Sequence, residues 1–108
     1  MKFIIFNGSL KLDAESNTFT VCKMAQLAFE KLGHECEIIT MRDLNYEGST
    51  DDVNDELKPH IMKMFDVDGV IFATPIWWGT HSCHIQAMLE RLDFIYSWAK
   101  DNKYQPFY

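Results

Sequence analysis

The sequence has little cysteine and no long apolar run. The three cysteines, Cys22, Cys36 and Cys83, are odd in number and widely spaced, which argues against a disulfide framework and excludes a CxxC motif. We therefore expect reduced thiols in a cytoplasmic protein. The first apolar run stops after four residues, too few for a signal peptide, and no run approaches the roughly 20 residues that a membrane helix needs.

Positive charge is also scarce. Lysine and arginine total 10 against 16 aspartates and glutamates, which gives a formal net charge of −6. This balance, without a basic run, argues against a nucleic-acid partner and against an anionic membrane surface. It leaves a phosphate ligand open, because backbone N–H groups at a helix start bind phosphate without a positively charged protein.

The five glycines do not form a nucleotide-binding fingerprint. Neither GxGxxG nor GxxxxGKS/T occurs, so the sequence supports neither a dinucleotide site nor a P-loop. A length of 108 residues suits one domain, residues 1–108.

Three short apolar runs alternate with three helical patterns. These elements are predicted, in chain order, at residues 3–6 (strand), 17–32 (helix), 37–40 (strand), 55–65 (helix), 69–74 (strand) and 82–98 (helix). Ser16 is a natural cap for the first helix, and Gly33 a natural stop. Continuous apolar strands between helices indicate a parallel sheet covered on both faces, an α/β three-layer fold.

The order of the strands follows from the handedness of their connections. Right-handed crossovers allow the order 2-1-3, in which the chain reverses direction beside the first strand. The loops after the first and third strands then lie side by side, at the crevice where such folds bind ligands. We therefore expect the functional site in residues 8–18 and 75–80.

The loop after the first strand is rich in hydrogen-bond donors. Ser9, Ser16, Asn17 and Thr18 offer side-chain donors, and Lys11 offers a positive charge. The start of the next helix adds free N–H groups and the positive end of its dipole. Two interpretations stay open from these residues alone: a phosphate site, or an ordinary turn with a serine cap.

The loop after the third strand holds two adjacent tryptophans, Trp77 and Trp78, between Pro75 and Gly79. Such a loop offers indole surface and backbone donors to a flat heteroaromatic ring. The alternative is that both indoles fill gaps between the loop and the helices. In the next residues, His81 and His84 are three apart at a helix start and could share a metal. No third ligand is visible beside them, so we predict no metal site there.

At these two loops the sequence resembles the NADPH-dependent FMN reductase family and its flavodoxin-fold relatives, which include iron–sulfur flavoproteins and quinone reductases. Gly8-Ser9-Leu10-Lys11, followed by Ser16-Asn17-Thr18, is similar to their GSxRxxSNT loop with a longer gap. Residues 74–80 and 86–93 are similar to their TPxYWGS…LKAFIDRLD run, and residues 51–53 to a DDM segment. The resemblance covers nearly the whole chain.

The resemblance implies a flavodoxin-like fold that holds FMN. The FMN phosphate would bind Ser9, Lys11, Ser16, Asn17 and Thr18. The ribityl chain and isoalloxazine ring would lie along Pro75, Ile76, Trp77, Trp78 and Gly79. Hydride would pass from NAD(P)H to the flavin and then to a small electron acceptor. The cofactor carries this chemistry, so no catalytic side chain is expected.

The sequence departs from the family pattern in several ways. Lys11 replaces the usual arginine, Trp77 the usual tyrosine and Gln86 the usual lysine. The cysteine-rich insert that binds a cluster in some relatives is missing between residues 44 and 51, so no iron–sulfur site is expected. The family fold has five strands, and the resemblance therefore implies a chain that lacks the last two βα units.

An incomplete sheet would leave the third strand, residues 70–74, with an unpaired edge. Such edges promote association, so we expect a homo-oligomer or a complementing chain at this strand. The alternative is that the aromatic tail, residues 104–108, folds back over the edge. Two other functions stay open. One is a flavin-binding electron carrier without reductase activity, and the other is a flavodoxin-like interaction domain without a cofactor.

Overall fold

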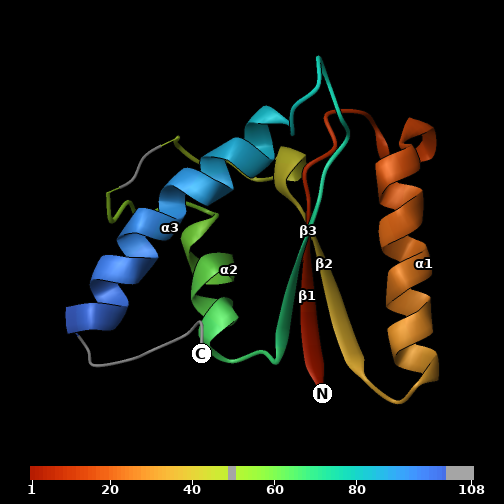
Figure 1. Cartoon of the computed structure of the whole chain (residues 1–108), viewed down its shortest axis with the longest axis horizontal. Coiled ribbons are helices and arrows are strands. Elements are labelled where there is room, and N and C mark those ends of the chain that lie inside the picture. The colour runs from red at the N-terminus through yellow and green to blue at the C-terminus, as the bar shows by residue number, and fades with distance from the viewer. Residues whose placement is uncertain (49–50, 102–108) are drawn as a thin grey trace.

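The computed structural model describes residues 1–48 and 51–101, and its centre is a three-stranded parallel sheet (Figure 1). The strands β1 (Lys2–Asn7), β2 (Glu35–Thr40) and β3 (Gly69–Ala73) lie in the order β2-β1-β3. Helix α1 (Asn17–Lys31) covers one face, and α2 (Lys58–Met62) and α3 (Cys83–Asp101) lie on the other. The predicted α/β flavodoxin-like architecture and strand order 2-1-3 are confirmed.

The central strand explains why its sequence is apolar without interruption. In β1, Ile4, Ile5 and Phe6 are almost completely buried, because helices cover both faces of the sheet. Phe6 is paired in register with Ile39 of β2 and Phe72 of β3. The strand therefore brings apolar side chains to both layers of the molecule.

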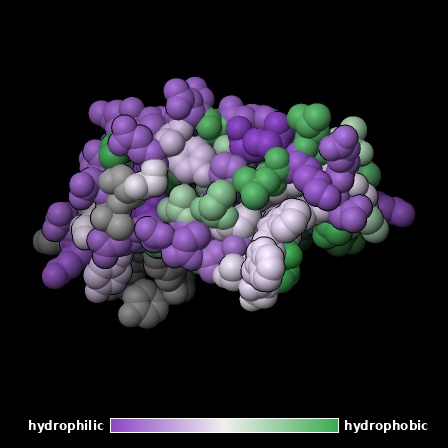
Figure 2. All heavy atoms as spheres, turned by 90° about the horizontal axis from the view of Figure 1, so that it is seen from above, coloured by the Kyte–Doolittle hydropathy of each residue, from purple (hydrophilic) through white to green (hydrophobic). Residues whose placement is uncertain are grey.

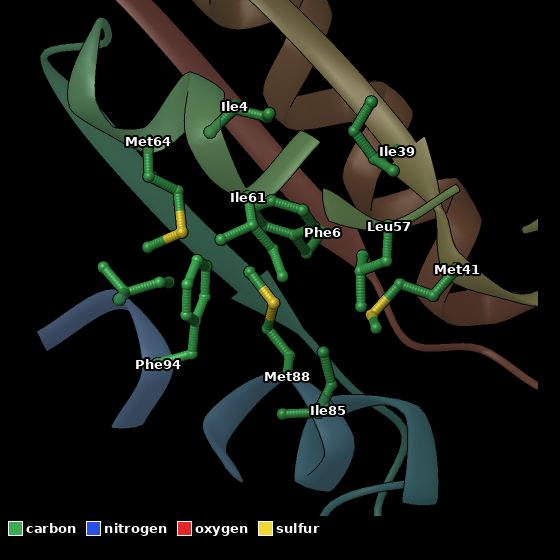
Figure 3. Packing of buried hydrophobic residues seen from close by; sticks show 11 residues of the cluster. Ile4, Phe6, Ile39, Met41, Leu57, Ile61, Met64, Ile85, Met88 and Phe94 are labelled. Atoms are coloured by element: carbon green, nitrogen blue, oxygen red, sulfur yellow. The ribbon is translucent and has the colours of Figure 1, made fainter. Parts of the chain in front are cut away.

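The larger core lies between the sheet and the α2–α3 layer. Figure 3 shows Ile4 and Phe6 of β1 pointing toward Ile61, Met64 and Met88 of the neighbouring helical segments. Full burial of each such side chain stabilises the fold by roughly 1.5–3 kcal/mol. This packing fixes α3, and with it the loop that precedes it, against the end of the sheet.

Helix α1 begins and stops near the residues that the sequence indicated. The Ser16 side chain accepts a hydrogen bond from the Phe19 N–H at 2.9 Å and caps the helix. At the other end Gly33 adopts a φ of +87°, and the His34 N–H donates to the Phe29 carbonyl at 2.9 Å. A left-handed residue after a helix favours glycine, because it has no Cβ.

The second helix is shorter than the predicted 55–65. Helix α2 spans only Lys58–Met62 and continues as a 3-10 turn, Lys63–Phe65. Asp55 lies before the helix, and its carboxylate accepts hydrogen bonds from the Leu57 and Lys58 N–H groups at 3.2 and 3.1 Å. Asp55 thus bonds the backbone just before the helix and at its first residue, and is not part of the helix, whose N-cap is Leu57.

The other predicted bounds need small corrections. Strand β2 begins at Glu35, two residues before the prediction, and α3 runs to Asp101 instead of 98. In the part of the chain that the structure describes, no helix is long and apolar enough to cross a membrane.

Candidate functional site

The loops that follow β1 and β3 meet at one end of the sheet, at the top of Figure 1, and enclose a small pocket. Its volume is about 140 Å³. The lining residues are Ser9, Leu10, Lys11, Ser16, Asn17, Thr18, Pro75, Ile76 and Trp77. The structure therefore brings together the two segments that the sequence singled out.

Two buried serines, Ser9 and Ser16, stabilise the first loop by bonding to each other. The Ser16 hydroxyl donates to the Ser9 hydroxyl oxygen at 2.7 Å, and the Lys11 N–H donates to the same oxygen at 3.2 Å. Ser16 also accepts the capping bond from Phe19. Ser9 thus accepts two hydrogen bonds and retains its own hydroxyl proton for a ligand.

The start of α1 supplies backbone donors to the same pocket. Because the Ser16 side chain caps only the Phe19 N–H, the N–H groups of Asn17 and Thr18 have no partner within the helix. Both residues line the pocket, beside Lys11. Two N–H groups, a helix dipole and one cation make this end of the pocket suited to an anion.

Asn7 supports the loop and was missed by sequence reasoning. Its side chain is fully buried, accepts from the Ser9 N–H at 3.1 Å and donates to Thr40 at 3.4 Å. A polar residue that ends an otherwise buried apolar strand is the signal that points to it. Leu10, which also lines the pocket, carried no such signal.

Gly8 has a packing role. A Cβ placed on Gly8 would lie 2.4 Å from a side-chain carbon of Ile85 and 2.8 Å from the Ser82 hydroxyl oxygen. The glycine therefore lets the end of β1 pass under α3. Its backbone N–H donates to the Ala73 carbonyl at 2.8 Å and joins the two loops where they begin.

The second loop closes in a tight turn. Trp77 and Thr80 exchange two backbone hydrogen bonds, at 2.9 and 3.0 Å, and the residues between them have positive φ angles, +52° at Trp78 and +78° at Gly79. This is the geometry of a type I′ turn. Thr74 anchors the loop to α3, because its hydroxyl oxygen accepts from the Ser82 N–H at 2.8 Å.

The turn separates the two tryptophans. Trp77 lines the pocket, and the Lys11 ammonium nitrogen lies 5.9 Å from its ring centroid, within the range of a cation–π contact. Trp78 is fully exposed, at 102% of its reference area, and like Gly79 it is not among the lining residues. Neither indole fills a gap in the core, because Trp77 is 45% exposed and Trp78 is fully exposed.

The two histidines near the start of α3 form hydrogen bonds with different residues. His81 Nε2 bonds to Gln86, and His84 Nδ1 bonds to the Tyr46 hydroxyl. Burial and the nearby Arg42 lower the pKa of His84, whereas burial raises the pKa of Tyr46 to about 12. Within residues 1–48 and 51–101, no three His, Cys, Asp or Glu side chains gather as metal ligands do.

Comparison with known proteins shows the family and the fold of the chain. A family model described as NADPH-dependent FMN reductase matches residues 1–107. The solved structure of RosB with a bound intermediate, 8-demethyl-8-formylriboflavin-5'-phosphate, superposes with a TM-score of 0.73 at 24% sequence identity. The alignment covers 86% of this chain and 42% of that chain, so the present chain spans less than half the length of that structure. No curated protein matches.

Proposed function

Because this chain belongs to the NADPH-dependent FMN reductase family, we propose that it binds FMN between the loops after β1 and β3. We further propose that it passes reducing equivalents from NAD(P)H through FMN to a small acceptor. The observation that carries the proposal is a pocket in which anion donors and an indole surface lie side by side.

The size of the pocket suits one end of FMN. Pockets that enclose a whole drug-sized ligand measure about 300–1,000 Å³, whereas this one measures about 140 Å³. We therefore place the phosphate inside, against Lys11, the Ser9 hydroxyl and the N–H groups of Asn17 and Thr18. Ser16 holds this loop in shape through its bonds to Ser9 and Phe19.

The flavin ring then lies over the open rim. Pro75, Ile76 and Trp77 border the ribityl chain and the ring, and Trp78 with Gly79 forms the turn that presents them. FMN, when bound, supplies the hydride chemistry. The chain's own residues bind and orient the cofactor, and the proposal assigns no side chain the role of acid or base.

An assembly through β3 belongs to the same proposal. Within the described residues β3 pairs only with β1, and its five residues carry no charge and no proline. Beside it lies a groove of about 310 Å³ lined by apolar side chains that include Met64, Phe72 and Leu92. An apolar edge strand that has neither a charged residue nor a proline favours pairing with a second copy or a complementing chain.

A visible spectrum tests the function directly. Purified protein supplied with FMN and then gel-filtered is expected to retain the flavin absorption bands, and the holoprotein is expected to consume NADPH when an acceptor is added. Flavin retention without NADPH consumption would favour the electron carrier over the reductase. A colourless protein under these conditions would contradict the proposal.

A further inference from the structure

The exposed tryptophan has a position that the fold itself does not explain. Bulky residues seldom adopt a positive φ, and glycine, asparagine and aspartate dominate type I′ turns. Trp78 nevertheless has a φ of +52° and is fully exposed. Among residues 1–48 and 51–101, no packing offsets this unfavourable backbone, so the indole is held outward at a cost to the folded state.

The turn holds this indole in a defined place, one residue after the pocket-lining Trp77. Two backbone hydrogen bonds between Trp77 and Thr80 close the turn, and Thr74 ties the loop to the start of α3. Trp77, one residue earlier, lines the pocket, and Trp78 does not. Figure 2, viewed from above this end of the molecule, shows apolar side chains among polar ones on the exposed surface.

The surroundings of the turn favour a flat uncharged molecule. Ile76 is 68% exposed and Leu10 is 45% exposed, so the rim presents apolar area to solvent on both loops. An indole is an electron-rich ring, and it stacks with planar rings in offset or edge-to-face geometry. An electron-poor oxidised ring is the complement of this surface.

We propose that Trp78 is the stacking platform for the second reactant, an oxidised planar acceptor, and does not hold FMN itself. The inference rests on the proposed function, because the acceptor must reach a flavin ring that lies over Ile76 and Trp77. Trp77 faces the cofactor and Trp78 faces the incoming acceptor. The strained turn thus holds the two indoles in different places, so that they contact different ligands.

The test compares Trp78→Gly with Trp77→Ala in the FMN-loaded protein, using 2-methyl-1,4-naphthoquinone as the acceptor probe. Glycine relieves the positive φ, so the fold of Trp78→Gly is retained. We expect Trp78→Gly to raise the KM for the naphthoquinone at least fivefold, while the FMN Kd and the KM for NADPH change less than twofold. Trp78→Phe restores part of the loss, and Trp77→Ala weakens FMN.

Calorimetric titration of the oxidised holoprotein with the naphthoquinone gives a readout without turnover, and Trp78→Gly is expected to weaken this binding. An unchanged KM and binding constant for the naphthoquinone would overturn the proposal, as would a selective rise in the KM for NADPH or a loss of FMN equal to that of Trp77→Ala. If the wild type binds no FMN, the proposed function fails. In that case the same titration is made on the apoprotein. The proposed role of Trp78 is then supported only if Trp78→Gly binds the naphthoquinone more weakly than the wild type does.

Discussion

At the scale of single residues, FMN binding is expected to depend most on the donors that line the pocket. Ser9 and Ser16 are buried and bonded to each other, so they shape the loop. Lys11 is exposed and lies beside the Trp77 ring. The charge on Lys11 is therefore the part of the site that can be removed with least damage to the fold.

Replacement of Lys11 by Ala is expected to weaken FMN and to leave riboflavin almost unaffected, because only FMN carries the phosphate. A hydrogen bond to a charged group contributes about 1.5–3 kcal/mol, so we expect a loss of roughly 10- to 100-fold in FMN affinity. Lys23→Ala is the matched control, since Lys23 lies on α1 and bonds to Gln26. Equal losses for both flavins, measured by fluorescence titration, would place the phosphate elsewhere.

At the scale of elements, close packing between β1 and α3 positions the two loops. Gly8→Ala is expected to lower the free energy of unfolding by about 1–3 kcal/mol, because the new Cβ overlaps Ile85 and Ser82. Gly48→Ala is the control, since nothing lies within 4 Å of a Cβ built there. Urea unfolding measures both, and equal stabilities for the two variants would show that α3 adjusts freely.

A buried ion pair fixes the segment before α2 against α3. Arg91 donates to the Asp55 carboxylate at 2.8 Å and to the Glu47 carbonyl at 2.7 Å, and both side chains of the ion pair are almost completely buried. Burial raises the pKa of Asp55, but hydrogen bonds from Arg91 and from the Glu47 and Lys58 N–H groups outweigh it and hold the pKa below its ordinary value.

The sign of this shift predicts how stability depends on pH. A carboxylate with a depressed pKa stabilises the folded state above its unfolded pKa of about 3.9, and this contribution is lost as the pH falls through the folded value. The free energy of unfolding should therefore decrease as the pH drops below about 4. In Asp55→Asn this decrease should be smaller, and the variant should be less stable than the wild type by about 3 kcal/mol near pH 7. Asp43→Asn, at an exposed ion pair, should leave the profile unchanged. A wild-type stability that falls no more steeply below pH 4 than that of Asp55→Asn would contradict the assignment.

The elements also show what the sequence could and could not predict. The three strands, the Ser16 cap and the Gly33 stop followed from local patterns, because each depends on residues close in the chain. The early start predicted for α2 was wrong because Asp55 lies before the helix and is held there by Arg91, 36 residues away. The separation of Trp77 from Trp78 depends on a turn whose positive φ falls on an indole, which no turn preference predicts.

At the scale of the whole molecule, the proposed assembly depends on the second edge of β3, with which no described strand pairs. The aromatic tail, residues 104–108, which could cover this edge, lies outside the described residues. Ile71→Lys is expected to reduce self-association measured by sedimentation at micromolar concentration, because a lysine on an edge strand opposes pairing. Glu35→Lys, on the outer strand β2, is the control and should associate as the wild type does. Circular dichroism checks that both variants fold. A wild type that sediments as a compact monomer at every concentration would contradict the assembly proposal.

The proposed role of the pocket between the two loops is to recognise the phosphate of FMN. The most direct measurement is a parallel titration of the wild-type protein with FMN and with riboflavin, followed by flavin fluorescence and by the melting temperature. We expect FMN to bind at least tenfold more tightly than riboflavin and to raise the melting temperature as its concentration exceeds the Kd. Unchanged fluorescence and melting temperature with FMN, or equal affinity for both flavins, would contradict it.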